Sequence, residues 1–158
     1  MTLRVTYSIK SPFNMRKIVL LCCLFMCVQF TTQAQEWLTD IDEAKKMASE
    51  KNRKIVLVFS GSDWSSLCLR LEKEMWTNQE FRDYANEHFV LLKADFPRRE
   101  ENRLTEEQQE KNTKLAEKYN LDGDFPHVVV LNKEGEVLGF TGYKDVSPYL
   151  YTKLLDSF

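Results

Sequence analysis

The stretch that decides the fold is Lys54-Ile-Val-Leu-Val-Phe-Ser-Gly-Ser-Asp-Trp-Ser-Ser-Leu-Cys68. Its first part, Lys54 to Ser60, is a continuous apolar run rich in β-branched residues, which is typical of a strand buried on both faces of a sheet. A turn begins at Gly61, and apolar residues then recur at helical spacing from Trp64 onward. A buried strand that feeds directly into a helix indicates an α/β fold.

Periodicity in the flanking sequence predicts the remaining elements. Amphipathic segments indicate helices, and Asp40, Thr105 and Ser147 are the N-cap candidates of three of them, with Thr105 and Gln108 forming a capping box. A four-residue turn, 132–135, joins two apolar runs into a hairpin. From residue 40 onward we expect helix 40–51, strand 54–60, helix 65–76, helix 80–87, strand 89–95, helix 105–119, strand 127–131, strand 137–141 and a closing helix from 147.

This order of elements carries two local features. The first is Trp64-Ser65-Ser66-Leu67-Cys68 at a helix start, and the second is a proline, Pro126, before the second-last strand. Together they resemble the thioredoxin-like family over essentially all of the chain after residue 34, and Gly61-Ser-Asp-Trp64 is similar to exported members. The resemblance implies a thioredoxin-like fold, with a central mixed β-sheet of about four strands flanked by helices and a cis-proline loop before the terminal β-hairpin.

The family motif is Trp-Cys-x-x-Cys, and this sequence departs from it at the attacking position. In the family, the first cysteine lies at a helix N-terminus that stabilises its thiolate, and the second resolves the mixed disulfide. The resemblance places Ser65 in the first position and Cys68 in the second. Because a serine hydroxyl cannot form a disulfide, the dithiol cycle is excluded.

Both motif residues also have a purely structural interpretation. Ser65 is a good N-cap, whose hydroxyl accepts a hydrogen bond from a backbone N–H at the helix start. Cys68 lies in an apolar stripe with Leu71 and Met75, as a buried structural cysteine does, yet it also matches the resolving position. For Cys68 both interpretations stay open.

Four residues, Trp64, Phe125, Pro126 and His127, are expected to form a binding surface beside the motif. Trp64 is either a core residue or a surface for clients, and its place before the motif favours partial exposure. The resemblance implies that Phe125 and Pro126 leave a backbone edge beside the motif. Family members pair this edge with an extended client peptide.

His127 follows the proline and is the last residue assigned to this surface. Many thioredoxins carry a buried acid six residues before the first motif cysteine, and here that position is Phe59. His127 would be a general base for Cys68 only if its ring came within reach. A histidine that is satisfied structurally is the other interpretation.

The N-terminus has the pattern of an export signal. A basic start at Met15-Arg16-Lys17 precedes the apolar run 18–28, which is too short to span a bilayer, and small residues occupy positions 32 and 34. We therefore expect a signal peptide over residues 1–34 that truly starts at Met15, and a thioredoxin-like domain over 35–158. The product would be periplasmic or secreted, with no membrane span after cleavage.

Lipid anchoring is the alternative for the N-terminal segment. It would use Cys22, Cys23 or Cys27, but none of these follows the small-residue pattern of a lipoprotein signal. Loss of the three cysteines with the signal peptide would leave Cys68 without an intramolecular disulfide partner. The remaining chain also lacks the usual Cys and His ligands of a zinc site, so neither a metal nor a cofactor is expected.

Charge narrows the choice of partners. The chain has 22 Lys and Arg against 24 Asp and Glu, and four of the basic residues but no acid precede residue 35, which leaves 18 basic against 24 acidic side chains. A net negative domain repels phosphate backbones, so nucleic-acid binding is disfavoured. The mixed run Arg98-Arg99-Glu100-Glu101 is interpreted as a solvated loop.

Two functions are compatible with the Ser-x-x-Cys motif. The first is an exported thioredoxin-fold protein that binds envelope client proteins or peptides beside Trp64, Cys68 and Pro126, in thiol-disulfide homeostasis without dithiol turnover. The rival is a monothiol disulfide oxidoreductase, isomerase or redox sensor acting through Cys68, with an envelope thiol reductant releasing its mixed disulfides. The family activity is thiol-disulfide oxidoreduction, and Ser65 leaves open whether this chain is an enzyme.

Overall fold

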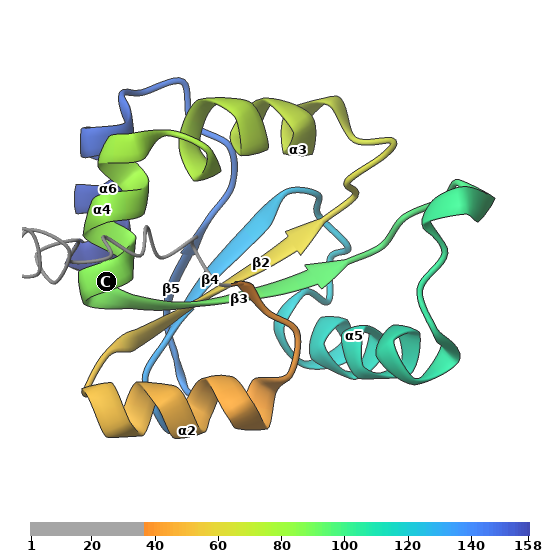
Figure 1. The fold of residues 1–158 in the computed structure, drawn as a ribbon, viewed down its shortest axis with the longest axis horizontal. Coiled ribbons are helices and arrows are strands. Elements are labelled where there is room, and N and C mark those ends of the chain that lie inside the picture. Colours follow the sequence, from red (N-terminus) through yellow and green to blue (C-terminus); the bar gives the residue numbers. More distant parts are fainter. Residues whose placement is uncertain (1–36) are drawn as a thin grey trace, which may run out of the picture. The chain divides into compact units, whose positions relative to one another are not determined.

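The computed structural model describes residues 37–158, which form an α/β domain (Figure 1). The predicted signal peptide over 1–34 and the predicted start at Met15 lie outside the described residues. No helix within residues 37–158 is long and apolar enough to cross a membrane. The elements are β1 (Trp37–Leu38), α2 (Ile41–Lys51), β2 (Lys54–Ser60), α3 (Ser66–Leu71), the π-helical turn η1 (Glu72–Trp76), α4 (Gln79–His88), β3 (Phe89–Asp95), the 3₁₀ turn η2 (Glu100–Asn102), α5 (Glu106–Tyr119), β4 (His127–Leu131), β5 (Val137–Thr141) and α6 (Pro148–Ser157).

The strands form one mixed sheet in the order β1-β3-β2-β4-β5. Strand β2 is central, parallel to β3 and antiparallel to β4, and β4 and β5 form the predicted hairpin. The mixed sheet is confirmed, but it has five strands where about four were expected. The additional strand, β1, pairs with β3 over only two residues. A strand of that length shows no period-two alternation, so the sequence carried no signal for it.

Helices cover both faces of the sheet, which explains the uninterrupted apolar run of β2 (Figure 1). Alternate side chains of a strand point to opposite faces. Val56 and Val58 pack in a core cluster with residues of α3, α4 and α6, whereas Leu57 and Phe59 pack in a second cluster with residues of α2 and α5. Apolar side chains are therefore needed at each of the five positions 55–59 of β2.

Side-chain caps begin the helices where the sequence predicts them. The Asp40 carboxylate accepts two backbone N–H bonds at the start of α2, and the Ser147 hydroxyl accepts one at the start of α6. The capping box at α5 is only half formed, because Thr105 accepts the N–H of Gln108 but the Gln108 side chain turns elsewhere. The motif helix ends at Trp76 as expected, with its last turn, η1, in the π form.

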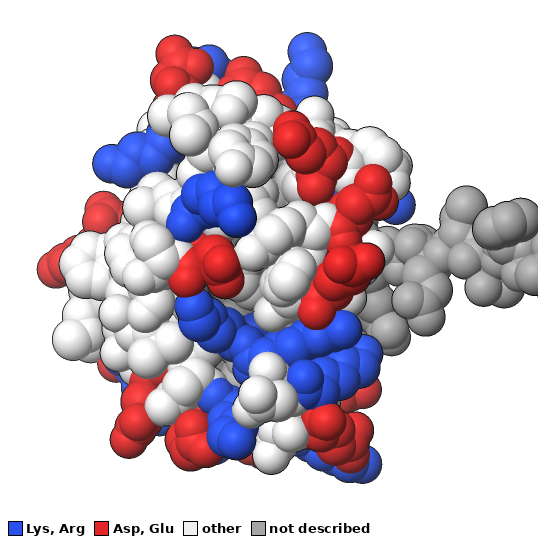
Figure 2. Space-filling view, turned by 90° about the vertical axis from the view of Figure 1, so that its left-hand side faces the viewer, with Lys and Arg blue, Asp and Glu red and all other residues white. Residues whose placement is uncertain are grey.

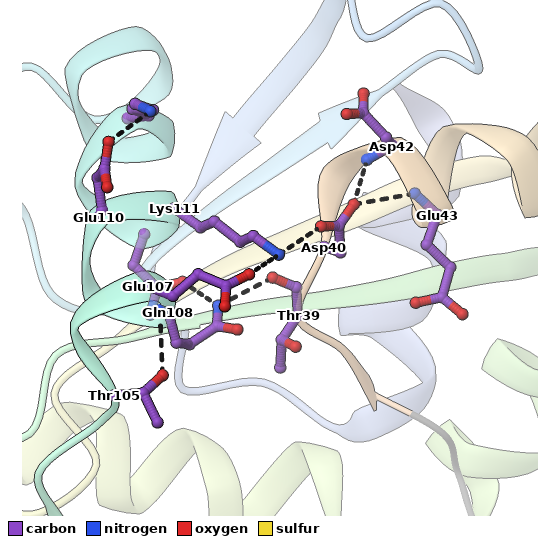
Figure 3. A network of polar contacts seen from close by, with 11 residues as sticks. Thr39, Asp40, Asp42, Glu43, Thr105, Glu107, Gln108, Glu110 and Lys111 are labelled. Carbon is purple, nitrogen blue, oxygen red and sulfur yellow. Dashed lines mark hydrogen bonds and ion pairs between the residues drawn. The ribbon is translucent and has the colours of Figure 1, made fainter.

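The Gln108 side chain takes part in a polar network that joins the α2 start to α5 (Figure 3). Its amide donates to the backbone carbonyl of Thr39 at 3.0 Å. Lys111 Nζ lies 3.1 Å from carboxylate oxygens of both Asp40 and Glu107. Hydrogen bonding from Lys111 holds the pKa of Asp40 below its ordinary value. The network fixes α5 against the sheet face that also carries α2.

Candidate functional site

The motif lies where β2 ends and α3 begins, with Ser65 as the N-cap of α3. The Ser65 Oγ accepts the backbone N–H of Cys68 at 3.4 Å. The same hydroxyl donates to the backbone carbonyl of Phe125 at 3.2 Å. Ser65 is only 8% exposed, so both hydrogen-bonding functions of its hydroxyl are used inside the protein. The N-cap interpretation of Ser65 is confirmed.

Cys68 is buried one turn into the same helix. Only 4% of the residue is exposed, and its Sγ accepts the backbone N–H of Gly61 at 3.3 Å. Leu71 and Met75, the other members of the predicted stripe, are fully buried beneath the helix. The thiol therefore faces the protein interior, as the structural interpretation of Cys68 expects.

The loop before β4 brings its aromatic residue and its proline to the motif. The Phe125–Pro126 peptide bond is cis, the geometry that the resemblance implies. The Phe125 ring meets the ring of Trp64 edge to face, with 5.3 Å between ring centroids. With the hydrogen bond from Ser65 to the Phe125 carbonyl, these contacts bring four of the predicted site residues together.

Trp64 is half-buried, in agreement with the expected partial exposure, but its indole is anchored. Its Nε1 donates to the backbone carbonyl of Phe96 at 2.7 Å. The ring packs so closely on Gly61 that a Cβ at that position would lie 2.4 Å from a ring carbon. The guanidinium carbon of Arg98 lies 3.7 Å from the ring centroid. Trp64 is thus held on several sides and is not a bare aromatic surface.

Asp63 is a site residue that the sequence analysis did not single out. Its carboxylate accepts the backbone N–H groups of Arg98 and Arg99, at 2.9 and 3.0 Å, and the side-chain amide of Asn102 at 3.0 Å. These donors, the Arg98 N–H first, hold the pKa of Asp63 below its ordinary value of 3.8. The carboxylate fastens the loop after β3 to the motif turn.

This contact adds to the interpretation of the run beginning at Arg98 as a solvated loop. The run is exposed, but its backbone is bound to Asp63 and its first side chain lies on Trp64. The order of the elements along the sequence could have predicted this contact between the two loops. Parallel neighbouring strands end at the same edge of a sheet, so the loops that follow β2 and β3 meet there.

His127 lies apart from the motif thiol. It stands opposite Phe59 in the β2–β4 pairing, and its ring centroid is 6.1 Å from that of Phe59 and 5.6 Å from that of Phe140. Directly paired residues of antiparallel strands share a face, and Phe59 faces α2 and α5. Cys68 belongs to α3 on the other face, so the condition for His127 to act as its base is not met.

A groove of about 810 Å³ borders the cis-proline loop and follows the edge strand β5. Its apolar lining includes Leu67, Phe125, Pro126 and Phe140. Leu67 and Phe140 are 44% and 67% exposed, high values for large apolar side chains. Within residues 37–158, no three His, Cys, Asp or Glu side chains are grouped so that they could hold a metal ion.

Comparison with known proteins agrees with this architecture. A family model described as the thioredoxin-like domain matches residues 41–158. The disulfide bond reductase DsbH of Chlamydia pneumoniae is 32% identical over 102 residues, which is 65% of this chain and 60% of DsbH. The thioredoxin-related protein DsbJ of the same organism is 26% identical over 98 residues, 62% of this chain and 27% of DsbJ. The chain thus spans less than two thirds of either relative.

Two solved structures extend the comparison. A DsbH oxidoreductase superposes with a TM-score of 0.71 at 29% identity, over 77% of this chain and 82% of the other. A putative disulphide-isomerase from Bacteroides thetaiotaomicron gives a TM-score of 0.55 at 26% identity, over 77% of this chain and 88% of the other. The mixed sheet with flanking helices is common to these proteins.

Proposed function

The chain belongs to the thioredoxin-like domain family, and we propose that it is an exported member that binds client or partner proteins in thiol-disulfide homeostasis without dithiol turnover. The observation that carries this proposal is the state of Ser65. It occupies the attacking position of the family motif, and its hydroxyl is engaged by Cys68 and Phe125. Thiol-disulfide homeostasis is proposed as the process because the relatives are named a disulfide bond reductase and a thioredoxin-related protein.

The absence of turnover follows from the chemistry of the two motif positions. Reduction of a client disulfide by a dithiol needs one thiolate to attack and a second thiol to displace the client. Ser65 supplies neither sulfur, and a single thiol at Cys68 would stop at the mixed disulfide. Attack by Cys68 would also require the helix start to open, because the residue is 4% exposed.

The proposed client binding uses a surface whose contacts do not depend on a cysteine thiol. The groove beside Phe125 and Pro126 is open, its lining combines apolar with polar and charged side chains, and it continues along an edge strand. Extended peptides bind such edges through main-chain hydrogen bonds, and pockets beside the edge select their side chains. Leu67 and Phe140 would contact a client segment that lies in this groove.

Export is proposed from the sequence pattern of residues 15–34. A basic start, a short apolar run and small residues at positions 32 and 34 are the features of a cleaved signal peptide. Bacterial envelopes oxidise thiols, so a domain with Cys68 as its one cysteine after residue 34 suits that compartment. Cleavage after Ala34 would be seen as an N-terminus at Gln35 in protein recovered from the envelope or the medium.

The turnover claim is tested by insulin-disulfide reduction with dithiothreitol as reductant. We expect the purified protein to match the dithiothreitol background, and the Ser65→Cys variant to exceed it by about tenfold or more, because that variant regains an attacking thiol at the helix start. Ser65→Ala is the matched control and should stay at background. Reduction by the wild type above background, abolished by Cys68→Ala, would overturn the proposal.

Ser65→Cys also tests the geometry. On oxidation it should form an internal disulfide with Cys68, since the two positions are one helical turn apart and Ser65 Oγ already contacts the Cys68 N–H. Mass spectrometry after thiol alkylation measures this directly. A variant that keeps two free thiols under oxidising conditions would show that the positions are not apposed.

One observation favours the monothiol rival. The Gly61 N–H is aimed at the Cys68 sulfur and would remain a donor to a thiolate there. If Cys68 works alone, wild-type cells should yield disulfide-linked partners on a non-reducing gel, and Cys68→Ser cells should lose them. An unchanged set of adducts in the Cys68→Ser variant would remove the rival.

A further inference from the structure

Arg98 is a basic side chain in direct contact with the motif tryptophan. Its guanidinium lies over the Trp64 ring, at 3.7 Å from Cζ to the centroid. None of the ion pairs formed within residues 37–158 uses Arg98. The residue is exposed. An arginine stacked on an aromatic ring keeps its N–H edges free to grip a carboxylate in a bidentate pair.

Three acids of the loops around Arg98 have other partners. Asp63 accepts three donors, two of them backbone N–H groups of the Arg98 loop itself. Asp95 accepts two hydrogen bonds from the motif turn. Glu100 is paired with Arg103 at 3.1 Å. The Arg98 charge, which forms no ion pair within residues 37–158, is available to a group outside the domain.

Basic side chains at the opposite end of β2 differ from Arg98 in their hydrogen bonding. Figure 2 shows a band of Lys and Arg side chains, flanked by acidic ones, on the side of the molecule that carries α4 and α6. Arg53 and Lys54, at the beginning of β2, donate to the backbone carbonyls of Asn86 and Asp156, at 2.7 and 2.6 Å. Arg53 and Lys54 thus form side-chain hydrogen bonds inside the domain, whereas within residues 37–158 the Arg98 guanidinium forms neither a hydrogen bond nor an ion pair.

The position of Arg98 relative to the groove is fixed. Asp63 binds its backbone to the motif turn, and the Trp64 ring contacts both the guanidinium and the ring of Phe125, which lines the groove. The guanidinium lies 3.7 Å and the Phe125 ring centroid 5.3 Å from the indole centroid, so the two are separated by at most about three residues of extended chain. A peptide in the groove can thus present a flanking side chain to Arg98.

We propose that Arg98 is a specificity-determining residue that selects client segments with a carboxylate within about three residues of the stretch bound in the groove. This inference rests on the proposed function, since it names the class of client for the same surface. The predicted preference for acidic clients is the opposite of what the net charge of the protein would favour. The 24 acidic against 18 basic side chains after residue 34 would by themselves favour basic clients.

The test uses three fluorescein-labelled decapeptides with one apolar centre, flanked on both sides by Glu, Gln or Lys, and fluorescence anisotropy with the purified protein. We expect the Glu peptide to bind about tenfold more tightly than the Lys peptide at low salt, with the preference shrinking as salt is added. Arg98→Gln should remove the preference, and Arg98→Glu should reverse it. Arg103→Gln is the matched control, because Arg103 lies in the same loop but is paired with Glu100; it should keep the preference.

The possible outcomes distinguish failure of the Arg98 role from failure of the proposed client-binding function. Equal binding of all three peptides, or a preference unchanged in Arg98→Gln, overturns the role of Arg98 and leaves the binding function standing. If none of the peptides binds, the client-binding function itself fails and the inference fails with it. Weaker binding of every peptide in Phe140→Ser, with the Glu preference kept, identifies the groove as the common site.

Discussion

The motif turn and the groove along β5 lie side by side but are built in opposite ways. In the turn, the hydroxyl of Ser65, the sulfur of Cys68 and the indole N–H of Trp64 all have partners inside the protein. In the groove, Leu67 and Phe140 are 44% and 67% exposed and have open space beside them. The region where the family does chemistry is closed, and the region where a peptide would lie is open.

This difference is what the proposed function expects of the two regions. A closed, fully hydrogen-bonded turn is what a structural N-cap and a buried cysteine require. Exposed apolar side chains on an edge strand have a cost in solubility and carry no stabilising role of their own. Their presence beside the closed motif favours the proposed binding over thiol chemistry.

The largest effect is expected from Gly61→Ala, which breaks the closed side. The new Cβ would lie 2.4 Å from the Trp64 ring, so the indole must move and lose its hydrogen bond to Phe96. We expect destabilisation of about 3 kcal/mol, at the upper end of overpacking costs. Urea unfolding measures it. In a Trp64→Ala background the same substitution should cost little, and an equal cost in both backgrounds would contradict the packing argument.

The second prediction compares the thiol of the closed side with one placed on the open side. Cys68 should react with a disulfide reagent roughly 100-fold more slowly in the native protein than in urea, because reaction requires a local opening of ~3 kcal/mol. A Phe140→Cys, Cys68→Ala double variant should react at the unfolded rate. A native Cys68 as fast as the unfolded thiol would instead favour the monothiol enzyme.

The sequence predicted the elements of this fold well wherever a periodic pattern was long enough to read. The buried run of β2 and the helix that follows it identified the family, and the strand bounds agree with the structure. The short strand β1 was not predicted, because its two residues show no local pattern and form a strand only through pairing with β3. The π-helical form of η1 was not predicted, because the spacing of its apolar residues is that of an ordinary α-helix.

The site was predicted only as far as the family motif reaches. Trp64, Ser65, Cys68, Phe125 and Pro126 follow from matching residues to motif positions. Asp63 and Arg98 required knowing which loop meets the motif turn and how its backbone N–H groups are aimed. His127 was ambiguous because alternation along a strand assigns a face only after the register with β2 is known.

A moderate effect is expected from substitutions that remove one side chain from each region. Ser65→Ala should destabilise the protein by about 1 kcal/mol, through loss of the N-cap. Phe140→Ala should change stability by less than about 0.5 kcal/mol, since the side chain is largely exposed, while weakening peptide binding. Paired urea curves and anisotropy titrations measure both. A larger loss of stability for Phe140→Ala than for Ser65→Ala would reverse the assignment of open and closed sides.

The smallest effect concerns the pH dependence contributed by Asp63. Its pKa is lowered in the folded state, chiefly by the Arg98 N–H and the Asn102 amide, so its contribution is complete at pH values above 3.8 and is lost as pH falls through the folded pKa. Asp63→Asn should therefore be less stable than wild type at neutral pH, and the difference should shrink on acidification below pH 3.8. Asn102→Ala, which keeps the carboxylate but removes one donor, should fall between the two. A stability difference between Asp63→Asn and wild type that stays constant from pH 7 to pH 3 would show that the fastening of the Arg98 loop does not depend on the charge of this carboxylate.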